Sequence, residues 1–114
     1  MIEIRPSQAL HLWRDVALAQ VHDDALDPSP RQVAILLIVY LELPPHTVRG
    51  LARRLGVTKP VVTRALNAFE KAGLVERRAD PSDRRNVLVG RTVEGADYVE
   101  RLGRTISEHA TRLS

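Results

Sequence analysis

Apolar residues recur at helical spacing near the start of the chain, between residues 6 and about 24. Intervals of three or four positions separate them, which places their side chains on one face of a helix. The residues on this face are Leu10, Trp13, Ala17 and Val21. Pro28 and Pro30 follow, and proline ends a helix because it lacks the amide donor and disfavours helical geometry in the residue before it. The pattern predicts a first helix with one apolar face.

The next segment, residues 31–43, is apolar on nearly all sides. Ser29 is suited to cap the start of a helix here, and Pro30 is suited to the first turn, where no amide donor is needed. Pro44 and Pro45 end the apolar run. We therefore expect a second helix that forms the buried centre of the domain.

Two shorter helical segments come after a short extended stretch at residues 46–48. The first segment, residues 49–55, predicts a third helix, and Gly56 supplies the turn that ends it. Thr58 can cap a fourth helix, and Gly73 can stop it. The two helices would therefore be separated by a turn of only a few residues.

The apolar spacing then changes from the helical period to that of strands. Residues 74–78 and 86–91 predict two strands, and the Asp-Pro-Ser-Asp segment at 80–83 is typical of a turn. A last helix is expected over residues 92–113. The predicted fold class is mainly α with a small β-hairpin.

The third and fourth helices satisfy the packing demands of a helix-turn-helix. Two short helices that meet closely need a small residue in the first, a glycine in the turn and apolar residues that seal the angle. Ala52 is the small residue, Gly56 follows four positions later, and Val62 comes ten after Ala52. The other sealing positions are Leu51, Leu55, Val57 and Ala65. The hairpin that follows makes the predicted fold a winged helix-turn-helix.

Charge is unevenly distributed along the chain. Residues 49–91 carry a net charge of +7, whereas residues 1–48 carry −3 and residues 92–114 carry −1, within a total of +3. A basic middle between acidic ends is typical of a protein that binds nucleic acid with its centre. A solvated basic face would give the same totals, so charge alone leaves both interpretations open.

Features that the sequence lacks disfavour several classes of protein. Without cysteine there are no disulfides, thiolate metal sites or thiol redox chemistry. No apolar run approaches the roughly 20 residues that span a bilayer, and the first residues lack the layout of a signal peptide, so we expect a cytoplasmic protein. Glycine-rich phosphate and dinucleotide motifs are missing, as is HExxH. We expect neither an enzyme nor a bound cofactor.

Two groups of ionisable residues could form a metal site or an acid–base pair, but the sequence favours neither role. A metal site could form if these residues met in a folded dimer, but separate surface histidines are the favoured interpretation; the candidate ligands are His22, Asp23, Asp24 and His109. Asp80 and Asp83 could form an acid–base pair. We expect Arg84 and Arg85 to hold both carboxylates ionised, which removes that role.

The fourth helix would be the reading helix, and its exposed residues suit contact with DNA. Arg64 can pair with guanine through two hydrogen bonds, Asn67 can pair with adenine in the same way, and Thr63 can bind a phosphate or a base. Lys59 and the amides at the helix start suit phosphate. The candidate recognition residues are Thr58, Lys59, Pro60, Val61, Thr63, Arg64 and Asn67. For each of them the alternative is a side chain that only faces solvent.

The hairpin turn places carboxylates beside arginines. A carboxylate that bonds a guanidinium fixes its direction, and a directed arginine can enter a narrow minor groove, where the negative potential is concentrated. The candidate wing residues are Asp83, Arg84 and Arg85, with Asp80 beside them. A salt-bridge cluster that only shapes the turn is the alternative, and such a cluster would contribute little to stability.

The sequence resembles the MarR family of transcription regulators in about half of its length. The resemblance is carried by residues 51–58, 66–75, 80–85 and 92–95, which include Asp-Pro-Ser-Asp-Arg-Arg in the wing and Thr-Val-Glu-Gly after it. It implies that Arg85 is the minor-groove arginine of the wing and that Asp83 orients it. Arg84 would be an accessory phosphate contact.

The resemblance also implies a homodimer held together by the first and last helices. The interface residues would be Leu10, Trp13, Ala17, Val21, Val99, Leu102, Ile106 and Leu113. The 114 residues would form one winged helix domain, with residues 29–91 as the DNA-binding core and 1–28 and 92–114 as dimerisation helices. The chain is shorter than most members, and Arg91 replaces a usual leucine. A compact or unusual dimer interface and a reduced or absent effector site are therefore open.

These residues predict a bacterial regulator that binds double-stranded DNA as a homodimer. Its operator would be an inverted repeat with half-site centres about 10 bp apart, one turn of the duplex. The alternative is a winged-helix module that docks on another protein without binding DNA. An exposed apolar patch on the reading helix would favour this alternative.

Overall fold

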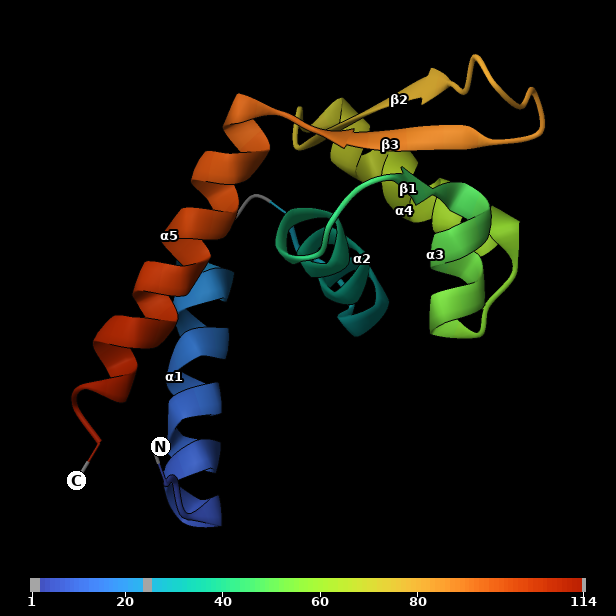
Figure 1. Ribbon diagram of the computed structural model, residues 1–114. Coiled ribbons are helices and arrows are strands. Elements are labelled where there is room, and N and C mark those ends of the chain that lie inside the picture. Colours follow the sequence, from blue (N-terminus) through green and yellow to red (C-terminus); the bar gives the residue numbers. More distant parts are fainter. Residues whose placement is uncertain (1–2, 24–25, 114) are drawn as a thin grey trace. The chain divides into compact units, whose positions relative to one another are not determined.

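The structure is a computed structural model that describes residues 3–23 and 26–113 (Figure 1). The chain divides into two compact units: Pro28–Val99, and a second unit made of Met1–Asp27 with Glu100–Ser114. The expected mainly helical fold with a β wing is confirmed. In chain order the elements are α1 (Pro6–Asp23), α2 (Pro30–Leu41), β1 (His46–Thr47), α3 (Val48–Leu55), α4 (Lys59–Lys71), β2 (Val75–Ala79), β3 (Val87–Arg91) and α5 (Val93–Ala110).

The wing is larger than the two-stranded hairpin that the sequence predicts. The sheet has three antiparallel strands in the order β1-β3-β2, because the extended residues before α3 pair with the outer edge of β3. Val89 lies at the centre of this sheet, opposite Arg77 of β2 and opposite His46 of β1. The third strand joins the wing to the first residues of the helix-turn-helix.

The centre of the Pro28–Val99 unit is built around α2. Ser29 caps this helix in the predicted way: its hydroxyl accepts from the amide of Gln32, and the Gln32 side chain accepts from the amide of Ser29. The helix ends at Leu41, two residues before the expected end. Its buried residues are Ile35, Leu36 and Val39. The rest of the core of this unit comes from the helix-turn-helix, the turn after it and the sheet: Val48, Leu51, Ala52, Val62, Ala65, Leu66, Phe69, Leu74, Val75 and Val89.

The helix-turn-helix forms as its spacing predicts. Ala52 and Val62 are buried where α3 meets α4, and Gly56 has a φ of 68°, in the left-handed region that favours glycine. Thr58 holds the N-cap position of α4, but its side chain makes no capping hydrogen bond. The second residue of α4 is Pro60, which has no amide, and the amide of Val61 already donates to the Thr58 carbonyl. The expected side-chain cap is therefore absent.

Arg91, the residue that departs from the family pattern, binds the end of α2. Its Nε donates to the Val39 carbonyl at 2.7 Å, and its Nη2 donates to the Glu42 carbonyl at 2.8 Å. The last carbonyls of a helix lack partners within the helix and carry partial negative charge, so a guanidinium stabilises them. Arg91 thereby ties the end of β3 to the end of α2.

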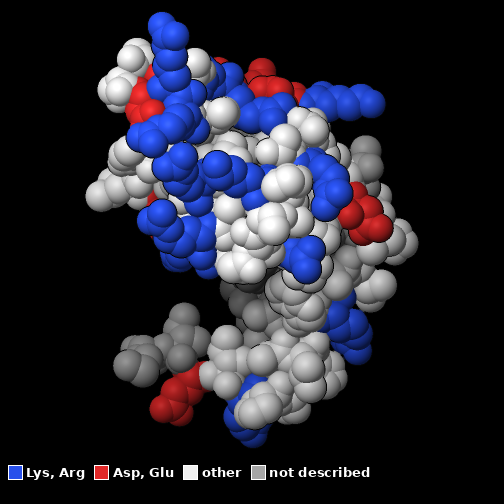
Figure 2. All heavy atoms as spheres, turned by 90° about the vertical axis from the view of Figure 1, so that its right-hand side faces the viewer, with Lys and Arg blue, Asp and Glu red and all other residues white. Residues whose placement is uncertain are grey.

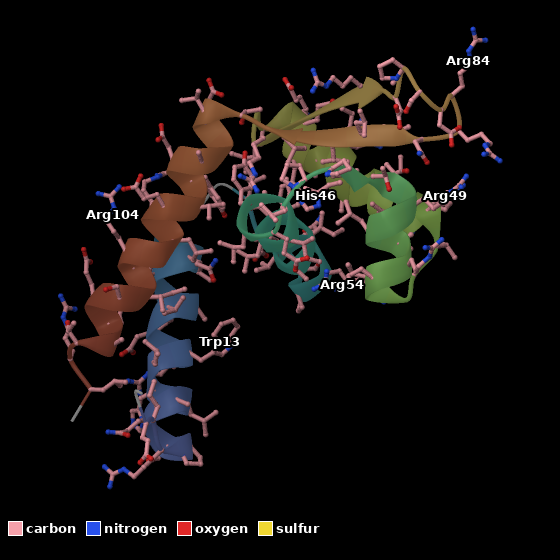
Figure 3. The ribbon with its side chains drawn as sticks, in the orientation of Figure 1. Trp13, His46, Arg49, Arg54, Arg84 and Arg104 are labelled. Atoms are coloured by element: carbon pink, nitrogen blue, oxygen red, sulfur yellow. The ribbon has the colours of Figure 1, made fainter. Side chains whose placement is uncertain are left out.

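In the second unit, the apolar face expected on α1 is exposed. Leu10, Trp13 and Val21 are 72%, 67% and 70% exposed, whereas Val16 on another face of α1 is buried. Figure 3 shows the Trp13 ring projecting from α1. Of the candidate interface residues of the last helical segment, Ile106 is exposed and Val99, Leu102 and Leu113 are half-buried. No helix in residues 3–23 and 26–113 combines the length and apolar character needed to cross a membrane.

Candidate nucleic-acid interface

A cationic groove lies between the helix-turn-helix and the wing. It encloses about 240 Å³ and takes side chains from α3, α4, β2 and the wing; its lining residues are Val48, Arg49, Lys59, Thr63, Arg77, Arg85 and Val87. Figure 2 views the side on which α3 and the wing turn lie, and it shows Lys and Arg side chains gathered over this face. The groove places the first half of α4 and the wing arginine on one continuous surface.

The exposed face of α4 carries the residues that the sequence predicts for it. Arg64 and Asn67 are exposed, as are Thr58, Lys59 and Pro60 at the helix start, while Val61 and Thr63 are half-buried. The opposite face is buried in the core through Val62, Ala65, Leu66 and Phe69. The core thus fixes which side of α4 is open to solvent.

In the wing, Asp83 holds Arg85 by three hydrogen bonds. The Asp83 Oδ1 accepts from the Arg85 amide at 3.0 Å and from its Nε at 3.3 Å, and Oδ2 accepts from Nη2 at 3.4 Å. The hydrogen bond from the Arg85 backbone amide is the main cause that holds the pKa of Asp83 below its usual range. The hydrogen bonds from the Arg85 guanidinium and the charge of Arg49 lower the pKa further. The Arg85 side chain remains 77% exposed. Its direction is fixed while its surface stays open.

Asp80 has a different partner from the one that the sequence suggests. Its Oδ1 accepts from the Ser82 hydroxyl at 2.7 Å and from the Ser82 amide at 2.9 Å, so Ser82, rather than an arginine, lowers the pKa of Asp80. The expectation that Arg84 and Arg85 hold both carboxylates ionised is therefore wrong for Asp80. Arg84 projects away from the wing turn (Figure 3).

Arg77, which belongs to none of the sequence motifs, links the wing to α4. Its Nη2 donates to Asn67 Oδ1 at 2.7 Å and to Glu70 Oε1 at 2.8 Å, and its amide donates to Glu70 Oε2 at 3.1 Å. The guanidinium hydrogen bond is the main cause that lowers the pKa of Glu70. Strand alternation places Arg77 on the same face of β2 as buried Val75, and this signal could have identified it.

Two further arginines of α3 have separate roles. Arg49 extends from the first turn of α3 and lines the groove (Figure 3). Arg54 donates to both carboxylate oxygens of Glu42, at 2.6 and 2.7 Å, and its hydrogen bonds are the main cause that lowers the pKa of Glu42. Arg54 therefore joins α3 to the end of α2, whereas Arg49 adds charge to the groove.

The candidate metal ligands do not form a site among the described residues. No group of three or more metal-ligating side chains is found in residues 3–23 and 26–113, and Asp24 lies outside them. His22 is exposed on the last turn of α1.

The Pro28–Val99 unit is thus a winged helix-turn-helix with a cationic groove beside its second helix. The sequence profile of the MarR family matches residues 29–87, just over half of the chain. The chain belongs to the MarR family, as its wing and helix-turn-helix motifs predict. This is a family of transcriptional regulators and not of enzymes.

Similar proteins agree with this assignment. The uncharacterised HTH-type transcriptional regulator YcgE of Bacillus subtilis (strain 168) is 34% identical over 72 residues, which are 63% of this chain and 47% of YcgE. The chain thus matches about half the length of that relative. The transcriptional regulator Tm0710 of Thermotoga maritima has a TM-score of 0.73 at 25% identity, covering 90% of this chain and 69% of Tm0710. The transcriptional repressor CouR, solved bound to a 23-mer DNA duplex, has a TM-score of 0.72 at 24% identity, covering 92% and 71%.

Proposed function

We propose that this chain is a sequence-specific regulator of transcription that binds double-stranded DNA. The observation that carries the proposal is the groove in which Arg49, Lys59, Arg77 and Arg85 converge from four separate elements. Backbone phosphates contribute much of the affinity of proteins for DNA, and a groove of this charge would follow one strand of the backbone. The fold shared with CouR, which was solved on a DNA duplex, supports the same function.

The helix α4 would lie in the major groove and read bases there. Arg64 is exposed and can pair with guanine O6 and N7 through two hydrogen bonds. Lys59 at the start of α4 would bind phosphate, with Thr58, Pro60, Val61 and Thr63 beside it. Arg64 would therefore specify a base, and the helix start would position the protein on the duplex.

The wing would extend into the adjacent minor groove. Asp83 holds the guanidinium of Arg85 in one direction while most of its surface stays exposed. An arginine pointed in this way is suited to a narrow minor groove, where the negative potential is strongest. Arg84 projects from the same turn and would bind a neighbouring phosphate.

We propose further that two copies of the chain bind an inverted repeat. A single chain presents one reading helix, whereas a symmetric operator needs two that are related by a two-fold axis. The exposed apolar face of α1, with Leu10, Trp13 and Val21, is the kind of surface that a second copy would cover. Ala17, three apolar residues of α5 (Val99, Leu102 and Ile106) and Leu113 just after α5 would complete the interface.

The alternative, a winged-helix module that docks on another protein, has less support. Such a module would use an apolar patch on the reading helix. None of the large exposed hydrophobic side chains in the described residues belongs to α4. The exposed face of this helix instead presents charged and amide groups, which suit DNA.

Mobility-shift titrations of genomic fragments test the proposal. We expect the full chain to bind a subset of fragments tightly, and Arg64→Ala or Arg85→Ala to weaken that binding by about 1–3 kcal/mol, or about 5- to 150-fold. Arg104→Ala is the matched control, because Arg104 is an exposed arginine of α5 outside the groove. Equal affinity of all four proteins across a salt series would contradict the proposal.

A further inference from the structure

We propose that Arg77 fixes the side-chain amide of Asn67 so that α4 presents an amide donor to DNA and does not pair with adenine. The partner of Asn67 would be a hydrogen-bond acceptor: O6 or N7 of guanine, O4 of thymine, or a phosphate oxygen. The inference rests on the proposed function, since it concerns what one residue of the reading helix recognises. It makes Arg77, a residue of the wing, a determinant of base preference.

The direction of the Asn67 amide follows from the chemistry of its partner. A guanidinium has only donors and stays charged at any physiological pH. The Asn67 atom that lies 2.7 Å from Arg77 Nη2 must therefore be the oxygen. Turning the amide over would place its NH₂ group against the NH₂ group of Arg77, so two donors would face each other. The Asn67 Nδ2 is consequently directed away from Arg77.

The Arg77 side chain is itself held in place, so it does not move with the side chain of Asn67. Glu70 accepts from the guanidinium at 2.8 Å through one carboxylate oxygen and from the Arg77 amide at 3.1 Å through the other. The Arg77 side chain is only 22% exposed, and its residue pairs with Val89 in the middle of the sheet. Hydrogen bonds between charged groups are roughly twice as strong as neutral ones, so Glu70 anchors Arg77 firmly.

Asn67 lies on the side of α4 that faces the groove. It follows Thr63 by four residues, which is the spacing of neighbours on one helix face. Thr63 and Arg77 both line the groove, and Asn67 is exposed. Pairing with adenine needs the amide oxygen to accept from N6 while Nδ2 donates to N7. The oxygen has a second lone pair, but its hydrogen bond to Arg77 turns it toward β2, so the NH₂ group is the part of the amide that is left to contact DNA.

In vitro selection of binding sites with substituted proteins tests the base preference. Comparison of the wild type with Asn67→Ala identifies the base position of the motif whose preference depends on Asn67. At this position we expect the wild type to show no enrichment of adenine. Arg77→Met frees the amide to turn, so adenine should become enriched there by about fivefold or more, the lower end of what a two-bond contact discriminates. The double variant Asn67→Ala with Arg77→Met should show no such gain. Arg78→Met is the matched control, because it removes the same charge from the exposed face of β2.

A second variant keeps Arg77 engaged, removes the donor and adds a negative charge in its place. Asn67→Asp retains an oxygen for Arg77 but carries no NH₂ group. We expect its thermal unfolding temperature to be equal to or above that of the wild type and its DNA affinity to fall about tenfold or more. If Asn67 contacts a base, Asn67→Ala will flatten the preference at one position. If it contacts a phosphate, Asn67→Ala will weaken binding equally on all sequences and lower the salt dependence.

The inference is overturned if the wild type enriches adenine at that position, or if Arg77→Met leaves the preference unchanged. It is also overturned if Asn67→Asp binds DNA as tightly as the wild type. These results would leave the proposed function standing, because a sequence motif would still have been selected. If the wild type selects no motif at all, the proposed function and this inference both fail.

Discussion

Gly95, at the start of α5, lies against the phenol oxygen of Tyr40 on α2 so closely that no side chain fits between them. A Cβ at position 95 would overlap the Tyr40 hydroxyl and the Leu74 carbonyl. The Tyr40 hydroxyl donates to the Leu74 carbonyl at 2.6 Å and accepts from the Thr92 amide at 3.0 Å. This contact joins α2, the turn before β2 and the junction of β3 with α5. The base of the wing is fixed by it.

Replacing Gly95 by alanine should destabilise the protein. The added methyl has no space, and overpacking of this kind typically costs about 1–3 kcal/mol. Gly103→Ala is the control in the same helix, because a Cβ there meets nothing within 4 Å. We expect that control to be neutral or stabilising by up to about 1 kcal/mol, since alanine favours helix over glycine. Urea unfolding of both variants measures the difference, and equal stabilities would contradict this packing.

Removal of the Tyr40 hydroxyl should also lower the free energy of unfolding. Tyr40→Phe keeps the ring but leaves the Thr92 amide without the acceptor it has in the wild type. A buried polar group left unpaired costs about 1–3 kcal/mol, and we expect a loss of that size in the free energy of unfolding. Arg78→Met, which changes an exposed side chain of the same unit, should lose less than about 0.5 kcal/mol. A Tyr40→Phe variant as stable as the wild type would contradict the proposed role of the hydroxyl.

The carboxyl group of Asp83 should titrate below the ordinary aspartate pKa of 3.8. Its pKa is lowered in the folded state, so its contribution to wing order is present above the ordinary value and is lost as the pH falls through the folded value. Following the Asp83 side-chain carbon by NMR as the pH is lowered measures the midpoint. Arg85→Ala should raise this midpoint, because the guanidinium is one cause of the lowered pKa. The hydrogen bond from the backbone amide of residue 85 remains in the variant, so the pKa should stay below the ordinary value. An unchanged midpoint in that variant would show that the guanidinium does not hold the carboxylate.

A charge on the exposed face of α1 should prevent the proposed dimer. Trp13→Glu would place a carboxylate in the apolar interface, where burying an unpaired charge is strongly unfavourable. We expect this variant to sediment as a monomer at concentrations where the wild type sediments as a dimer. His22→Glu introduces the same charge at an exposed position outside the apolar face and should leave the dimer intact. A monomeric wild type, or a dimeric Trp13→Glu variant, would contradict this interface.

The helices and the reading face follow from the sequence because they depend on local spacing. Ala52, Gly56 and Val62 must occupy fixed intervals for two short helices to meet, and the apolar residues of α4 then decide which side is exposed. The end of α2 is harder to place, because Leu41 and Leu43 are equally apolar and both are exposed. A hydrophobic pattern cannot choose between them.

Contacts between distant segments are what the sequence could not supply. The third strand forms because His46 meets Val89, some forty positions later. The bonds from Arg91 to the end of α2 likewise join segments far apart in the chain. Arg77 is harder to recognise for a different reason: it is one of many arginines in a basic region. Strand alternation marks only that it shares a face of β2 with Val75, and its bonds to Asn67 and Glu70 exist only in the folded chain.

Selection of duplexes from a random pool by the full chain at about 0.15 M salt tests the central claim most directly, since phosphate attraction alone is weakened there. Enrichment of an inverted repeat whose half-site centres lie about 10 bp apart is the predicted result. Loss of that enrichment in Arg64→Ala, with Arg104→Ala unaffected, would assign the reading to α4. A pool that remains random after selection would contradict the claim that this protein reads DNA sequence.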